Sequence, residues 1–250
     1  MWRLHVEEVP LFVLEGGCIG MSCGYILGPV CDVPREGVRV RCAGSHERES
    51  GGRRLGGGDV ACIYVLHYGG SIRVGVAGIR VAVGKMLSHV PFMGVVAALI
   101  ELESGAEPGS IVQLAVEEAG RMGVELKPGR PGLAELVECW RSPPRGFLEQ
   151  LERAEEGRDP MVVDGVREAV EAAVTAAEAH GDLLYEPALF WFTTDRRVDW
   201  VPPPIPRALR EGEEVTLKLL PNGMLVLETS EGVWSCTFWE LRDALFEPLI

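Results

Sequence analysis

The chain has 250 residues, of which 47% are apolar and 24% charged, and its formal net charge at pH 7 is −13. This composition excludes wholesale disorder, and the acidic balance disfavours nucleic-acid binding, because neutralising phosphates needs clustered cations. No charge-free apolar stretch reaches about 18 residues, so we expect no membrane span. Residues 1–14 carry two glutamates and a proline instead of the apolar run of a signal peptide, which predicts a cytoplasmic protein.

The choice of polar residues is strongly biased. The chain holds three lysines against 21 arginines, a single asparagine and two glutamines. Side-chain amides deamidate at high temperature and arginine forms multi-donor ion pairs, so the bias predicts a thermophile protein with an archaeal-like composition. A GC-rich genome is the alternative explanation for the arginines, although it would not itself select glutamate over glutamine.

The first third of the chain, residues 1–84, is predicted to be rich in β-strands. Glycine and proline punctuate its short apolar or alternating runs, and Gly69-Gly70 suits a tight hairpin. The segment 44–58 is rich in glycine and has little to bury, so we expect a mobile loop there. The expected strands are 11–14, 24–27, 38–42, 59–68, 71–76 and 79–83.

The middle of the chain, residues 86–181, is predicted to be helical. The clearest helix is Pro160–His180, which Asp159 caps, Pro160 opens and Gly181 ends. Its apolar residues step by three or four and form one stripe, made of Val163, Val166, Val170, Val174 and Ala177. The other expected helices are 91–105, 111–123, 133–141 and 147–156.

After a proline-rich connector at 201–206, residues 207–250 are predicted to form a small β-meander with a closing helix. Asn222-Gly223 is the strongest short hairpin signal in the chain. The expected strands are 215–220, 224–229 and 233–238, and the expected helix is 239–246. The sequence therefore predicts an α+β fold, with a main domain over 1–200 and a small domain over 207–250 packed on it.

Two familiar motifs fail on spacing. Gly20–Gly24 (GMSCG) resembles the nucleophile elbow of α/β-hydrolases, but only 21 residues precede Ser22, too few for the strand and helix that the elbow needs before it. Gly78–Lys85 (GIRVAVGK) resembles a phosphate-binding P-loop, but five residues separate its glycines, and Met86 replaces the magnesium-binding hydroxyl. A glycine-rich turn and a strand are the better interpretations.

The short segments Cys62–Tyr64 and Ala82–Gly84 resemble the two motifs of GIY-YIG nucleases. The resemblance implies a catalytic role for Tyr64 and a metal-binding glutamate at 101 or 103. This chain departs from the family pattern at Ala82, where a second tyrosine belongs. It also has no arginine between positions 85 and 121, where the family's helix carries one.

The cysteines and histidines show no standard ligand spacing. Cys18, Cys23, Cys31 and Cys42 lack a CxxC pair, so buried thiols are the first interpretation, with a disulfide or a metal site as alternatives. The histidines form no HxH or HExxH pattern, and His180 is placed to cap the carbonyl end of the long helix. No motif specifies a metal or a cofactor.

Two regions of the sequence are candidate binding sites. Residues 35–54 carry a net charge of +3, whereas residues 101–186 carry −11 on what we expect to be solvated helical faces. A glycine-rich loop with exposed arginines can close over a phosphate or an acidic partner, and aromatics beside arginines form interface anchors or stacking platforms. The candidate binding residues are Arg48, Arg53 and Arg54 in the loop, and Trp191, Arg196, Arg197 and Trp200 in the aromatic segment 190–200.

These observations favour a cytoplasmic protein that works by binding a protein partner or a second copy of itself, as a subunit or assembly factor. The alternative is an enzyme acting on phosphate esters or nucleic acid, with the 44–58 loop as a flap. Its catalytic carboxylates would have to come together from distant positions, which a spacing pattern does not reveal.

Overall fold

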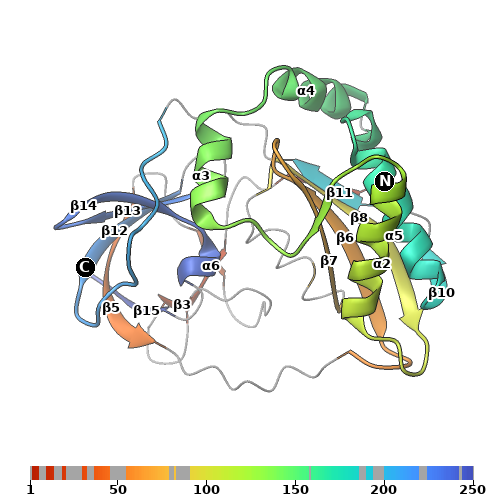
Figure 1. The fold of residues 1–250 in the computed structure, drawn as a ribbon. Helices are drawn as coiled ribbons and strands as arrows, with labels where there is room; N and C mark the ends of the chain where they lie inside the picture. Colours follow the sequence, from red (N-terminus) through yellow and green to blue (C-terminus); the bar gives the residue numbers. More distant parts are fainter. Residues whose placement is uncertain are drawn as a thin grey trace.

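The computed structural model is an α+β fold in which two β-sheets lie side by side. Figure 1 shows helices α3 (Leu133–Arg141) and α6 (Phe238–Leu241) between the sheets. The structure describes residues 2–5, 10–13, 19–20, 30–32, 37–45, 55–78, 82, 91–157, 159–185, 190–193, 200–219, 224–241 and 244–249.

Sheet A has seven strands among the described residues and contains the main core. Its order is β1-β11-β8-β6-β7-β9, and β10 pairs with the C-terminal half of β8. Strand β6 is antiparallel to both β7 and β8, whereas β9 runs parallel to β7. The bounds are β1 Trp2–His5, β6 Val60–His67, β7 Ile72–Gly78, β8 Met93–Leu102, β9 Leu126–Pro128, β10 Gly181–Tyr185 and β11 Phe190–Thr193.

Helices α2 (Pro108–Arg121) and α5 (Val166–Glu178) pack against each other and cover one face of sheet A (Figure 1). Alanine dominates their buried faces, and small side chains allow two helices to approach closely. The buried residues are Ile111, Ala115 and Ala119 of α2, and Val166, Ala169, Val170, Ala172, Ala173, Ala176 and Ala177 of α5. Helix α4 (Phe147–Gly157) and the short 3-10 helix η1 (Pro160–Val162) lead into α5.

Sheet B joins strands from both ends of the chain. Its eight described strands have the order β14-β13-β12-β5-β15-β3-β2-β4. Strand β5 pairs on one side with β12 and on the other with β15, so strands from both sides of the predicted boundary at 200–207 share one sheet. The domain division itself stays a prediction. The bounds are β2 Pro10–Val13, β3 Ile19–Gly20, β4 Val30–Asp32, β5 Val38–Ser45, β12 Glu214–Leu219, β13 Leu225–Thr229, β14 Gly232–Cys236 and β15 Ala244–Pro248.

Several local predictions are confirmed. Strands β6 and β7 form the predicted hairpin, closed by a hydrogen bond of 3.0 Å from Tyr68 N–H to the Ser71 carbonyl. The helix at 133–141 has the predicted bounds. His180 Nδ1 lies 2.9 Å from the Ala176 carbonyl at the end of α5, as a capping histidine should. The strands of the C-terminal meander pair in the expected order.

The predicted helix at 91–105 is wrong. Residues 93–102 form β8, a central strand of sheet A whose two faces are both buried. An almost continuous apolar run is typical of a strand that is covered on both faces. Such a run has no hydrophobic periodicity by which it could be distinguished from a buried helix. The spacing of Val95, Leu99 and Leu102 therefore fits either structure.

Two further helices are shorter than predicted. The helix expected at 160–180 is broken after η1, because Gly165 adopts a left-handed backbone with φ +77, and α5 begins at Val166. The predicted stripe stays largely buried, although Val174 is only partly so. Likewise, the closing helix expected at 239–246 is described as helical only in α6, and residues 244–248 form strand β15, in which Phe246 is fully buried.

Candidate functional site

The residues predicted to form the loop site lie outside the described part of the chain. Arg48, Arg53 and Arg54 all fall within 46–54. Only the ends of the predicted loop are described, with β5 running to Ser45 and a turn at Gly57-Gly58 leading into β6. The mobility of this segment and its arginines' part in binding therefore stay predictions.

The aromatic segment is described only in part. Arg196 and Arg197 lie outside the described residues, and Trp191 is placed by its backbone, which pairs with Val95 in sheet A. Trp200 is described and exposes 57% of its surface. The described residues do not show whether these four side chains lie together, so this binding site stays a prediction.

The four cysteines left open by the sequence are only partly described. Cys18 and Cys23 lie outside the described residues, and Cys31 is placed by its backbone in β4. Cys42 is a buried free thiol, so the buried-thiol interpretation fits this one position. Within the described residues, no three histidine, cysteine, aspartate or glutamate side chains are grouped so that they could hold a metal ion.

Tyr64, the residue singled out by the nuclease resemblance, is a core side chain. It is 4% exposed, and burial raises the pKa of its phenol above the usual value. Its ring lies over Gly75, the residue opposite it on β7, where an added Cβ would come within 2.4 Å of the ring carbon Cζ. Glu101 pairs with Val60, four residues away along β6, so the implied catalytic tyrosine and this glutamate do not converge.

A core role for Tyr64 predicts that Gly75→Ala is destabilising only while the ring is present. The three Tyr64 side-chain atoms nearest the added Cβ are Cζ, the hydroxyl oxygen Oη and Cε2, none of which exists in leucine. We expect Gly75→Ala to lower the free energy of unfolding by roughly 1–3 kcal/mol in the native chain. With Tyr64→Leu present, we expect no loss, or a gain of about 0.5 kcal/mol, because alanine loses less backbone entropy than glycine on folding. Denaturant unfolding of the four proteins in the cycle measures this coupling. Equal costs in both backgrounds would contradict the packing described.

His67 lies at the end of β6 in an aromatic environment. Its ring stacks on Phe147 with centroids 4.8 Å apart, and its Nδ1 accepts a hydrogen bond of 3.0 Å from the Gly69 N–H. Burial lowers the pKa of the imidazole to about 4, and the nearby Asp164 opposes this shift only in part. The ring is therefore neutral at physiological pH and acts as a packed acceptor.

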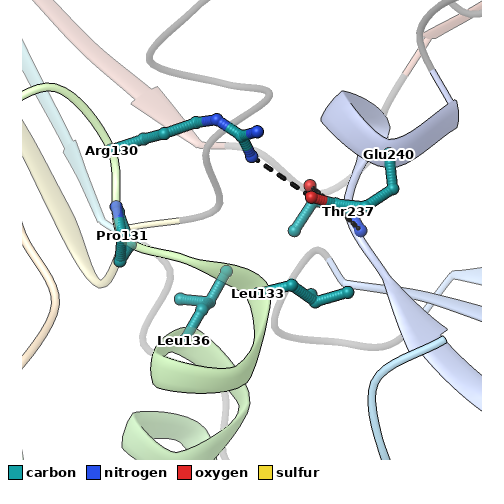
Figure 2. Close-up of a pocket in the computed structure, with 6 residues that line it drawn as sticks. All are labelled: Arg130, Pro131, Leu133, Leu136, Thr237 and Glu240. Carbon is teal, nitrogen blue, oxygen red and sulfur yellow. Dashed lines mark hydrogen bonds and ion pairs between the residues drawn. The ribbon is translucent and has the colours of Figure 1, made fainter. Parts of the chain in front are cut away.

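A chain of ion pairs connects sheet A to the α6 end of sheet B. Arg73 of β7 pairs with Glu135 of α3 at 3.0 Å and donates to the Arg130 carbonyl at 3.2 Å. The Arg130 guanidinium in turn pairs with Glu240 of α6 at 3.1 Å, as Figure 2 shows. Glu240 also accepts the Thr237 N–H at 2.8 Å, which is the carboxylate half of a capping box at the start of α6.

The pocket around the Arg130–Glu240 pair is small. Its lining combines the start of α3 with α6 (Figure 2), and its volume is about 10 Å³, far below the range of roughly 300–1,000 Å³ that is typical of ligand sites. Because its charged groups already pair with each other, we interpret it as a junction that fixes the two sheets, not as a ligand site. The lining residues are Arg130, Pro131, Leu133, Leu136, Thr237 and Glu240.

A much larger groove runs between α2 and the edge of sheet A, and we call it the α2–β7 groove. Its volume is about 600 Å³, and it is open to solvent. The lining is mainly apolar, with a glutamine and a glutamate on the helix side. The lining residues are Val76, Pro108, Gly109, Val112, Gln113, Val116, Glu117 and Pro128.

Helix α2 forms one wall of this groove because it carries two apolar stripes. Ile111, Ala115 and Ala119 are buried against the core. Pro108, Val112 and Val116, also spaced by four residues, lie beside that stripe and stay partly exposed. Four residues of α-helix rise about 6 Å, so the second stripe presents apolar groups at intervals of that length along the groove.

On the sheet side the groove is lined by Val76 of β7, whose outer edge is paired only in part among the described residues. Strand β9 pairs only with Ile72–Val74 and then ends, because Pro128 has no N–H and Gly129 turns the chain away with φ +71. The Gly129 N–H donates to the Val74 carbonyl at 3.1 Å, so Val74 directs its polar groups toward β9. Polar groups alternate along a strand, and Val76 therefore directs its N–H and C=O toward the same edge. Beyond Val74, no described strand pairs with β7 on that side.

Among the described lining residues of the groove, Glu117 is the charged one. It is exposed, and its Oε1 accepts a hydrogen bond of 3.1 Å from Gln113 Nε2. The groove thus combines a mainly apolar wall, a strand edge with which no described strand pairs beyond Val74, and one glutamate.

Comparison of the chain with protein-family models, with curated proteins and with solved structures found no match. None of the described helices is long and apolar enough to cross a membrane.

Proposed function

We propose that the chain is a partner-binding protein, a subunit or assembly factor, that holds a segment of another protein in the α2–β7 groove. The observation that carries this proposal is a mainly apolar groove of about 600 Å³ beside an edge of β7 with which no described strand pairs beyond Val74. Contiguous apolar surface rimmed by polar residues is typical of interaction sites, and unpaired strand edges are ready to pair with another chain.

We further propose that the protein is cytoplasmic and that it comes from a thermophile. Cys42, Cys62, Cys139 and Cys236 are free thiols, which suits the reducing cytosol. The scarcity of asparagine and glutamine suits a thermophile. Catalysis on phosphate esters or nucleic acid stays a prediction from the sequence, because its candidate arginines lie outside the described residues.

Selection from a random displayed-peptide library tests the proposed function. We expect selection on the native protein to enrich peptides that bind with micromolar affinity. Val116→Glu should weaken them at least about tenfold, because it places a carboxylate on the apolar wall of the groove. Fluorescence anisotropy with the labelled peptides measures the affinities, and circular dichroism checks that the variant is folded.

Val162→Glu is the matched control. Val162 is 46% exposed and lies in η1, so the same substitution adds the same charge away from the groove. We expect it to leave the affinities within about twofold of the native value. A failure to enrich any peptide, or enriched peptides that bind native protein and Val116→Glu equally, would show that the groove is not the binding site.

A further inference from the structure

We infer that binding in the α2–β7 groove is regulated from the junction between the two sheets, through residues 128–130, which we call the β9–α3 link. This inference rests on the proposed function and deepens it. The link begins at Pro128, which lines the groove, and ends at Arg130, whose guanidinium pairs with Glu240 of α6 at 3.1 Å. Three residues of backbone therefore connect the groove wall to the junction.

Arg73 holds both ends of the link from the side of sheet A. Its Nη1 donates to the Pro128 carbonyl at 3.3 Å and to the Arg130 carbonyl at 3.2 Å. Its Nη2 donates to both carboxylate oxygens of Glu135, each at 3.0 Å, so the guanidinium is itself held in place by α3. Because one nitrogen bonds both carbonyls, Arg130 cannot move relative to Pro128 without weakening one of these bonds.

The groove wall at Pro128 follows the backbone of the link. The proline ring is fused to its own backbone, so its place on the wall is set by that backbone alone. The next residue, Gly129, has φ +71, and its N–H donates to the Val74 carbonyl at 3.1 Å. The Gly129 amide therefore reports directly on how firmly the link is held.

The Arg130–Glu240 pair holds the far end of the link from the side of sheet B. The two side chains are 32% and 20% exposed, so solvent ions screen this pair less than a fully exposed one. Withdrawal of α6 from Arg130 frees that end of the link and loosens the wall at Pro128. A wall that must be ordered on binding lowers the affinity for an occupant. Couplings between binding events are reciprocal, so an occupant of the groove in turn strengthens the junction.

Glu240→Gln tests this coupling, because it removes the charge of the pair without touching the lining of the groove. We expect the Gly129 amide to exchange at least about threefold faster, and the labelled library peptides to bind about fivefold more weakly. In a cycle with Arg130→Gln, the double variant should bind no more weakly than either single variant. Conversely, saturating peptide should slow exchange of the Thr237 amide, which Glu240 accepts, at least about threefold in the native protein.

Glu213→Gln is the matched control. Glu213 also pairs with an arginine, Arg207, at 2.9 Å and also accepts a backbone N–H, that of Arg210, at 2.9 Å. It is not part of the groove lining, and no printed bond connects it to the link. We expect Gly129 exchange and the peptide affinities to stay within about twofold of the native values. Circular dichroism checks that both glutamine variants are folded.

Three results would overturn the coupling: unchanged Gly129 exchange in Glu240→Gln, peptide affinities that respond equally to Glu240→Gln and Glu213→Gln, or a Thr237 amide indifferent to bound peptide. Each can occur while the library peptides still depend on Val116, in which case the groove remains a binding site without this regulation. Failure to enrich any peptide, or loss of the Val116 dependence, removes the proposed function and the regulation with it. The two failures are therefore distinguishable.

Discussion

Val170→Asp is expected to lower the free energy of unfolding by roughly 4 kcal/mol, the largest effect among the substitutions considered. Val170 is fully buried in α5, between sheet A and α2. The substitution removes apolar contacts and places a carboxyl group where no solvent reaches it. For a chain of this length, such a loss lowers the melting temperature by about 10 °C. Differential scanning calorimetry at neutral pH measures it.

The control for this prediction lies on the other side of the same helix. Thr175 is exposed, and its hydroxyl bonds only to the Glu171 carbonyl one turn earlier. Thr175→Asp introduces the same carboxylate into solvent, and we expect the melting temperature to stay within about 2 °C of the native value. If Val170→Asp melts as close to the native protein as this control does, α5 does not pack on sheet A as described.

The helix at 133–141 was predictable from the sequence alone, and β8 shows why some elements were not. Leu133–Arg141 has a regular apolar face and clear turn residues on both sides, so its bounds follow from local pattern. In β8, nearly every residue from Met93 to Ile100 is buried. Only the strands on either side of it, contributed by distant segments, distinguish such a run from a helix.

The candidate site was predictable in part. The second stripe of α2, with Pro108, Val112 and Val116 beside Ile111 and Ala115, is visible in the sequence as an apolar face wider than one core contact needs. The sequence does not show what this stripe of α2 faces. That depends on how far β9 pairs along β7, which local pattern does not predict. The sequence predicted binding at the loop arginines and at Trp191 and Trp200 instead, because glycine-rich segments with arginines and aromatics beside arginines can be recognised from composition alone.

The protein is expected to lose about 3 kcal/mol of stability as the pH falls from 6.5 to 4, because of His67 alone. Burial holds its folded-state pKa at about 4, against about 6.5 in the unfolded chain. Between these values the unfolded state binds a proton that the folded state does not, so stability is complete above pH 6.5 and decreases as the pH falls. Below pH 4 both states are protonated, and this loss stops growing.

Carboxylates destabilise the protein in a lower pH range. Hydrogen bonding to Arg207 lowers the pKa of Glu213, so the stability that this pair contributes is lost as the pH falls from the ordinary range of a glutamate toward the lowered pKa. Denaturant unfolding at pH 7.0, 6.0 and 5.0 therefore measures the effect of His67 above the range in which this pair is lost, and a measurement at pH 4.5 extends it.

His67→Phe is the variant that tests this assignment. Phenylalanine can keep the stacking on Phe147 but cannot accept the Gly69 N–H, so we expect a pH-independent loss of about 1 kcal/mol. The decrease in stability between pH 6.5 and 4.5 should largely disappear in this variant. In the native protein, the imidazole resonances of His67 should stay those of the neutral ring down to about pH 5 in an NMR titration. A His67 that titrates near pH 6.5, or a variant that keeps the full acid loss, would show that the ring is not enclosed as described.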